Sequence, residues 1–144
     1  MKTVHVSRTI NVPADTLWDH LICYDTFAEV EPGGIDLSRF RGRIMREGDD
    51  ISVPLRIGPF PAGTWTIDVL RVDPDNRVIK TEECGGPVKR VARTMVATWL
   101  AEDYCRYDDH VVIDAGMLSG LVAARVRRAC QARQERLAAL LENA

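Results

Sequence analysis

The sequence lacks the features that mark membrane, secreted or nucleic-acid-binding proteins. No stretch approaches the roughly 18 consecutive apolar residues of a membrane-spanning helix. The first residues carry Lys2, His5 and Arg8 without an apolar run, so they do not resemble a signal peptide. The 19 Lys and Arg residues do not outnumber the 21 Asp and Glu residues, whereas phosphate-backbone binding normally needs a basic excess. We therefore expect a cytoplasmic protein without an integral membrane segment or a nucleic-acid partner.

Motifs for metal, nucleotide or nucleophile chemistry are also missing. No two of the four cysteines have metal-ligand or redox spacing, and the three histidines lack the i, i+4 spacing of a metal-binding helix. The chain contains no Gly-x-Ser-x-Gly, no phosphate-binding loop and no glycine-rich dinucleotide turn. The residues concerned are Cys23, Cys84, Cys105, Cys130, His5, His20 and His110. We expect free thiols, no metal and no cofactor.

The composition is that of one folded domain. The chain has 144 residues, of which 46% are hydrophobic and 28% charged, so it can bury a core but is too short for two ordinary domains. Residues 4–10 alternate and are rich in β-branched side chains, which predicts a strand. Pro13 suits the first turn of a helix over residues 13–22, and a second short helix is expected near residues 25–30.

Residues 36–115 change to a β pattern. Strands are predicted at residues 37–45, 51–57, 64–72, 77–83, 88–100 and 104–115. Short turn sequences separate them, which favours antiparallel hairpins over helical crossovers. With the first strand, this makes a curved seven-stranded antiparallel sheet.

A long C-terminal helix is predicted over residues 117–143, which contain no proline and only Gly120 as a helix breaker. At helical spacing its apolar residues gather on one side: Leu118, Val122, Val126, Ala129, Cys130, Leu137 and Leu140. The fold class is therefore α+β, with this helix covering one face of the sheet.

This arrangement predicts a cavity. Sheets twist and curl, so a straight helix cannot touch a curved sheet along its whole length. Only 6% of the residues are aromatic, which leaves few large side chains to fill the gap. Ligand cavities commonly measure about 300–1,000 Å³, and we expect one of this kind between sheet and helix.

Two segments resemble a known superfamily. Residues 6–21, from Val6 through Pro13 and Trp18 to Leu21, resemble the opening of START-like, or SRPBCC, proteins. Residues 107–116 resemble their last strand as it enters the C-terminal helix. This group includes polyketide cyclases and dehydrases, lipid-transfer domains and plant pollen allergens. The resemblance implies one START-like ligand-binding domain over residues 1–144, with the helix-grip fold, and does not choose between carrier, receptor and enzyme.

One face of the last predicted strand carries an unusual carboxylate. Cys105, Tyr107, Asp109, Val111 and Ile113 alternate onto this face. Burying ionised Asp109 there is costly unless it finds a partner or stays neutral. It is either a polar anchor or general acid at the wall of the cavity, with Tyr107 as a second proton-transfer group, or a structural partner for a buried backbone group or arginine.

Other candidate ligand contacts come from the central strands and the long helix. Arg133 lies within the apolar stripe of the helix, where it either binds a ligand anion, pairs with Asp109, or extends its guanidinium to water. The remaining candidates share apolar faces, where they either line the cavity or pack as ordinary core: Trp65, Ile67, Arg93, Met95, Trp99, Val111, Ile113, Val122 and Val126.

These residues support two functional hypotheses and leave a third open. The preferred one is a non-enzymatic protein that binds a small hydrophobic molecule such as a lipid, isoprenoid, polyketide or aromatic metabolite. The alternative is a cofactor-independent cyclase or dehydrase in which Asp109, Tyr107 or an arginine acts on a ketide chain. An interaction module with a filled interior is the third, and the sequence does not give an oligomeric state.

Overall fold

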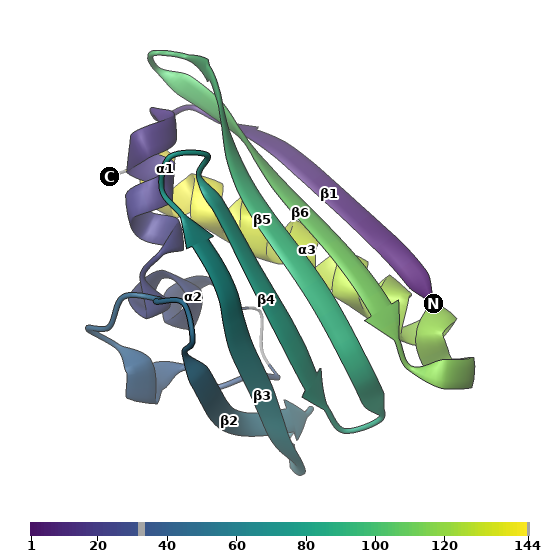
Figure 1. Ribbon diagram of the computed structural model, residues 1–144. Helices are drawn as coiled ribbons and strands as arrows, with labels where there is room; N and C mark the ends of the chain where they lie inside the picture. The colour runs from purple at the N-terminus through teal and green to yellow at the C-terminus, as the bar shows by residue number, and fades with distance from the viewer. Residues whose placement is uncertain (32–33, 144) are drawn as a thin grey trace.

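Six antiparallel strands form one sheet in the computed structural model, which describes residues 1–31 and 34–143. The strand order is β1-β6-β5-β4-β3-β2, so the first and last strands of the chain are neighbours at one edge (Figure 1). The strands are β1 Lys2–Ile10, β2 Asp50–Ile57, β3 Phe60–Asp73, β4 Val78–Gly85, β5 Val88–Ala101 and β6 Tyr104–Asp114. Every connection from β2 to β6 is short, as the turn sequences predict.

Helices cover one face of this sheet. The short helices are α1 Ala14–Leu21 and α2 Tyr24–Val30, the 3-10 turns are η1 Ser38–Phe40 and η2 Gly116–Leu118, and the long helix is α3 Ser119–Glu142. In Figure 1 α3 runs diagonally behind the strands, with α1 and α2 beside its C-terminal half. Among the described residues, no helix is both long and apolar enough to cross a bilayer.

The sheet has six strands and not the seven expected, because residues 37–45 do not form a strand. Only Leu37 and Met45 of this segment are buried, while the alternating arginines Arg39, Arg41 and Arg43 are exposed. The segment contains the turn η1, and its backbone bonds to the junction of α1 and α2, with the Met45 amide donating to the Ile22 carbonyl at 2.7 Å. Between its buried ends the apolar residues are Phe40, which belongs to η1, and Ile44, which is 53% exposed, so the segment has no continuous face to bury in a sheet.

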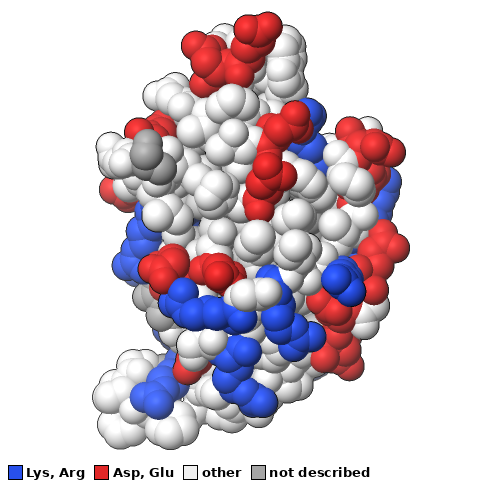
Figure 2. Space-filling view, turned by 90° about the vertical axis from the view of Figure 1, so that its left-hand side faces the viewer, with Lys and Arg blue, Asp and Glu red and all other residues white. Residues whose placement is uncertain are grey.

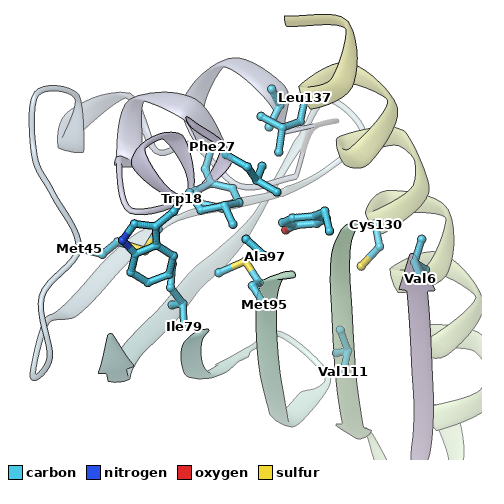
Figure 3. Packing of buried hydrophobic residues seen from close by; sticks show 14 of the residues in the cluster. Val6, Trp18, Phe27, Met45, Ile79, Met95, Ala97, Val111, Cys130 and Leu137 are labelled. Carbon is cyan, nitrogen blue, oxygen red and sulfur yellow. The ribbon is translucent and has the colours of Figure 1, made fainter. Parts of the chain in front are cut away.

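Helix α3 contacts the sheet mainly through β1 and β6. On this edge Val4, Val6, Val111 and Ile113 are buried together with Leu137 of the helix. Figure 3 shows Cys130 projecting from α3 toward the interior, between Val6 and the strand that carries Met95 and Ala97. The apolar stripe differs from the predicted one at its ends, since Leu118 and Leu140 are exposed and Leu141 is buried. Leu141 follows Leu137 by four residues and therefore lies on the same buried side of α3.

Two glycines provide a test of this packing. A Cβ on Gly85 would lie 2.6 Å from both the Thr64 carbonyl oxygen and Cε3 of Trp65, whereas a Cβ on Gly120 in α3 would meet nothing closer than 4.0 Å. We expect Gly85→Ala to lower the free energy of unfolding by about 1–3 kcal/mol because backbone atoms must shift. Gly120→Ala should raise it by up to about 1 kcal/mol through helix propensity. Urea unfolding measures both, and equal effects of the two substitutions would contradict the packing described.

Candidate functional site

A cavity of about 790 Å³ lies between α3, α2 and the central strands. Its volume is in the range of small-molecule sites. Residues of β2, β3, β4 and β5 line it, and none of the described residues of β1 or β6 does. The cavity therefore lies toward the β2 edge of the sheet, away from the two strands that α3 contacts closely. A cavity between sheet and helix therefore exists, and the divergence of a straight helix from a twisted sheet accounts for its position.

Most of the cavity wall is apolar. Trp65 and Ile67 of β3, Met95 of β5 and Val126 of α3 face it, and Phe27 of α2 closes one side. The other apolar lining residues are Tyr24, Ile35, Leu37, Met45, Leu55, Pro87, Val88, Val122, Ala129, Cys130 and Ala132. In Figure 3 Phe27 and Met95 lie on opposite sides of this interior, with Met45, Trp18 and Ile79 together at one end.

Glu83 forms a charged position within the apolar wall. Its carboxylate accepts hydrogen bonds from Arg93 Nε at 3.0 Å, Trp65 Nε1 at 2.9 Å and Thr81 Oγ1 at 2.7 Å. Burial acts to raise the pKa of Glu83, but the charge of Arg93 and these three donors outweigh burial, so its pKa is lowered. Glu83 is therefore an ionised, fully satisfied carboxylate that fixes Arg93 and Trp65 against the cavity.

Asp109 joins the helix to the sheet directly beside this position. It is completely buried and accepts hydrogen bonds from Arg133 Nη2 at 3.1 Å and Gln134 Nε2 at 3.2 Å, both on α3. Tyr107 donates to it at 3.2 Å within β6, and Arg93 Nη1 lies 3.7 Å away. We call Glu83, Arg93, Asp109 and Arg133 the buried ion cluster. Within it, each cation contacts a carboxylate, as burial of charge demands.

Tyr107 is neutral in this setting. Burial, followed by the nearby charge of Asp109, raises the pKa of its phenol well above the ordinary value. Its hydroxyl is therefore a hydrogen-bond donor to Asp109 at neutral pH.

Arg133 links the buried ion cluster to the cavity. Its guanidinium lies over the Phe27 ring at 5.5 Å, and Nη1 is 4.0 Å from the Glu31 carboxylate. Its Nε is buried and has no hydrogen-bond partner among the described residues. An unpaired buried donor costs about 1–3 kcal/mol, and the protein carries this cost at Arg133.

Glu31 is the second carboxylate of the cavity and differs from Glu83. Burial raises its pKa, and the nearby charges of Arg133 and Arg93 offset this only in part. Its side chain is 13% exposed and lines the cavity. Glu31 thus keeps its proton to a higher pH than an ordinary glutamate, which suits a group that donates or accepts a proton.

The structure places some of the residues expected from the sequence at the cavity and others away from it. The cavity is lined by Trp65, Ile67, Arg93, Met95, Val122, Val126 and Arg133. The residues outside its lining are Tyr107, Asp109, Val111, Ile113 and Trp99.

The β6 residues lie outside the lining because α3 packs directly over that strand. Val111 and Ile113 belong to the closed core, and Asp109 reaches the cavity only through Arg93 and Arg133. Trp99 is 56% exposed, because it lies near the end of the β5–β6 hairpin, where the strand pairing shifts after Trp99. The structure therefore places these residues outside the cavity that the sequence analysis expected them to line.

The sequence reading missed Glu31, Thr81 and Glu83. Ile79, Thr81 and Glu83 alternate onto one buried face of β4, so a carboxylate on an apolar strand face was a usable signal for Glu83. Glu31 follows the end of α2 and has no local pattern that could have identified it.

Comparison with known proteins shows relationships in structure only. No protein-family model and no curated protein matches the sequence. The Zhui aromatase/cyclase from a Streptomyces species is 19% identical, with a TM-score of 0.75 over 98% of this chain and 93% of that one. Norcoclaurine synthase from Thalictrum flavum, solved with dopamine and hydroxybenzaldehyde, is 16% identical, with a TM-score of 0.72 over 99% and 87% of the two chains. A START superfamily protein from Mycobacterium smegmatis is 10% identical, with a TM-score of 0.73 over 98% and 97%.

These similarities confirm the helix-grip fold that the START-like resemblance of the sequence implies. The chain has this architecture with a six-stranded sheet. Identities this low carry the fold and not the chemistry.

The role of Asp109 can be tested by a matched pair of substitutions. Asp109→Asn keeps the shape of the side chain but leaves two buried arginines with one fewer anion, and we expect it to lower the free energy of unfolding by about 3 kcal/mol. Asp15→Asn removes a carboxylate that is 80% exposed and lies 2.7 Å from Arg77, and should cost less than about 1 kcal/mol. Urea unfolding of both variants gives the comparison. Similar losses in the two would show that Asp109 is not a structural centre.

Proposed function

We propose that the protein binds a small, mainly apolar molecule that has an anionic or hydrogen-bond-accepting group at one end. Lipids, isoprenoids, polyketides and aromatic metabolites contain molecules of this kind. The observation that supports the proposal is the cavity of about 790 Å³ with apolar walls and two arginines at one side. Apolar area provides the affinity in such sites, while a few polar groups fix the orientation.

The polar end is assigned to Arg93 and Arg133. Both line the cavity, and Glu83 and Asp109 hold them from behind at 3.0 Å and 3.1 Å. Because these carboxylates fix the guanidinium groups in advance, little side-chain entropy is lost when a ligand binds. A ligand oxygen would bind the parts of these two guanidinium groups that face the cavity, and not the Nε of Arg133, which is buried.

More arginines lie at the exposed part of the cavity. Arg56 of β2 and Arg125 and Arg128 of α3 line it and are exposed. Figure 2 looks onto the side of the molecule where α2 and β2 lie, and Lys and Arg side chains gather in the middle and lower part of that face. The positive charge of Arg56, Arg125 and Arg128 favours the approach of an anionic ligand over a cationic one.

Cavity occupancy can be tested with two fluorescent probes that differ by one charge. Anilinonaphthalene sulfonate is apolar and anionic, and phenylnaphthylamine has the same ring system without the sulfonate. We expect both to bind the wild-type protein saturably. Ala129→Trp places a large side chain in the cavity from α3 and should weaken both probes by about tenfold or more, as measured by fluorescence titration.

Ala124→Trp is the control for this substitution, because Ala124 is on the same helix but is exposed and does not line the cavity. It should leave both affinities unchanged. Arg125→Gln combined with Arg128→Gln should weaken only the sulfonate probe. Equal binding to the Ala129→Trp and Ala124→Trp proteins would place the probes elsewhere and refute the proposal.

The second candidate function is a cofactor-independent cyclase or dehydrase, and Glu31 is the observation that favours it. In an intramolecular aldol condensation, a methylene carbon of a ketide chain gives a proton to solvent water and bonds to a ketone carbon of the same chain. The resulting alkoxide takes up a proton from Glu31, which regains one from solvent, and dehydration then releases water. Arg93 and Arg133 are placed to stabilise the oxyanions, and Glu31, with its raised pKa, is placed to supply the proton.

This candidate makes a separate prediction about pH. A general acid works in its protonated form, so cyclisation should slow as the pH rises through the raised pKa of Glu31. A linear polyketide thioester is a suitable substrate, and mass spectrometry detects the product by loss of water. We expect Glu31→Gln to lower the rate by about 100-fold and to remove this pH dependence.

Glu29→Gln is the matched control, since Glu29 lies on α2 two residues before Glu31, is exposed and pairs with Arg41 on the surface. It should keep both the rate and the pH profile. No cyclised product from the wild-type protein, together with saturable probe binding, would leave binding as the function and eliminate the enzyme.

A further inference from the structure

A second hollow lies on the opposite face of the sheet from α3. It has a volume of about 370 Å³ and is formed by side chains of β1, β5 and β6. Its lining residues are His5, Ser7, Val96, Thr98, Arg106, Asp108 and His110. None of these residues lines the cavity described above, so this hollow is independent of the proposed function.

Strand pairing brings two histidines and an aspartate together here. His5 of β1 is directly opposite His110 of β6, although the sequence separates them by most of the chain. Asp108 is two residues from His110 and therefore points to the same face of the sheet. The two imidazole rings stack, with centroids 4.0 Å apart and an angle of 10° between their planes.

The donor atoms of these three residues lie within metal-binding reach of one another. His5 Nε2 is 2.8 Å from Asp108 Oδ1, and one donor atom from each residue lies within 4.8 Å of the others. Zinc binds imidazole nitrogen and carboxylate oxygen at about 2.0–2.2 Å, so two ligands at a tetrahedral angle are about 3.4 Å apart. Insertion of an ion would widen the His5–Asp108 contact by well under 1 Å and replace the proton that these two groups share.

We propose that His5, Asp108 and His110 form a binding site for a borderline transition-metal ion, of which Zn²⁺ is the representative. Two neutral imidazoles and one carboxylate are a donor set that zinc accepts, and three protein ligands leave one position for water. Hard ions such as Mg²⁺ and Ca²⁺ prefer all-oxygen ligands and are disfavoured here.

Arg106 and the strand pairing hold Asp108 beside His5 in advance, whereas the His110 ring, which stacks on that of His5, must rotate to direct a nitrogen at the same ion. Arg106 Nε donates to Asp108 Oδ2 at 2.9 Å, which leaves Oδ1 directed at His5. Hydrogen bonds of this kind orient metal-ligating carboxylates in known sites. The charge of Arg106 also opposes a dication, so we expect micromolar rather than nanomolar affinity.

Zinc titration of the metal-free protein, without an affinity tag, tests the site. Isothermal titration calorimetry should show one Zn²⁺ per chain, and Mg²⁺ should not compete. His5→Gln and His110→Gln should each weaken binding by about tenfold or more. Both side chains are exposed on the sheet, and circular dichroism would verify that the variants fold.

Two control variants exclude other zinc ligands. His20 is on α1, where its Nδ1 lies 2.9 Å from the Thr16 carbonyl oxygen, and Cys84 is an exposed thiol. His20→Gln and Cys84→Ser should bind zinc like the wild type. In NMR spectra of the wild-type protein, zinc should shift the imidazole signals of His5 and His110 and leave those of His20 in place. The absence of saturable binding, or binding that survives both His5→Gln and His110→Gln, would overturn the proposal.

Discussion

Asp109 holds helix α3 and the sheet together at one fixed distance. Its carboxylate accepts hydrogen bonds from Arg133 and Gln134 of the helix and from Tyr107 of β6, while Gln134 also donates to the Val6 carbonyl of β1 at 2.9 Å. Charged and polar groups in a dry interior must be paired with good geometry, so this contact specifies where along the sheet the helix sits. The cavity opens beside this contact, where α3 leaves the strands.

The same contact gives the cavity its polar end. Arg93 and Arg133 are held on one side by Glu83 and Asp109 and face the apolar space on the other. A ligand therefore meets donors that are already oriented, next to walls that favour apolar groups.

Local sequence patterns predicted much of the fold but only part of the site. Six strands were expected between residues 37 and 115, and the structure contains five of them together with the expected helix α3. Periodicity and turn residues identified these elements because both signals depend on neighbours in the chain. The strand predicted at residues 37–45 was wrong, because its alternating arginines are all exposed and the segment forms the turn η1 in place of a buried strand face. Trp99 was misplaced because the pairing of β5 and β6 shifts after it near the end of their hairpin. Glu31 was missed because its burial depends on where the helices cross the sheet. His5 and His110 likewise became neighbours only through the pairing of the first and last strands.

A double-mutant cycle between Asp109 and Arg133 tests the central claim most directly. The free energies of unfolding of Asp109→Ala, Arg133→Ala and the double variant would be compared with that of the wild type. If the two residues connect helix and sheet as described, the double variant loses about 2 kcal/mol less than the sum of the single losses. Losses that add to within about 0.5 kcal/mol would mean that the two side chains act independently, and would contradict the account.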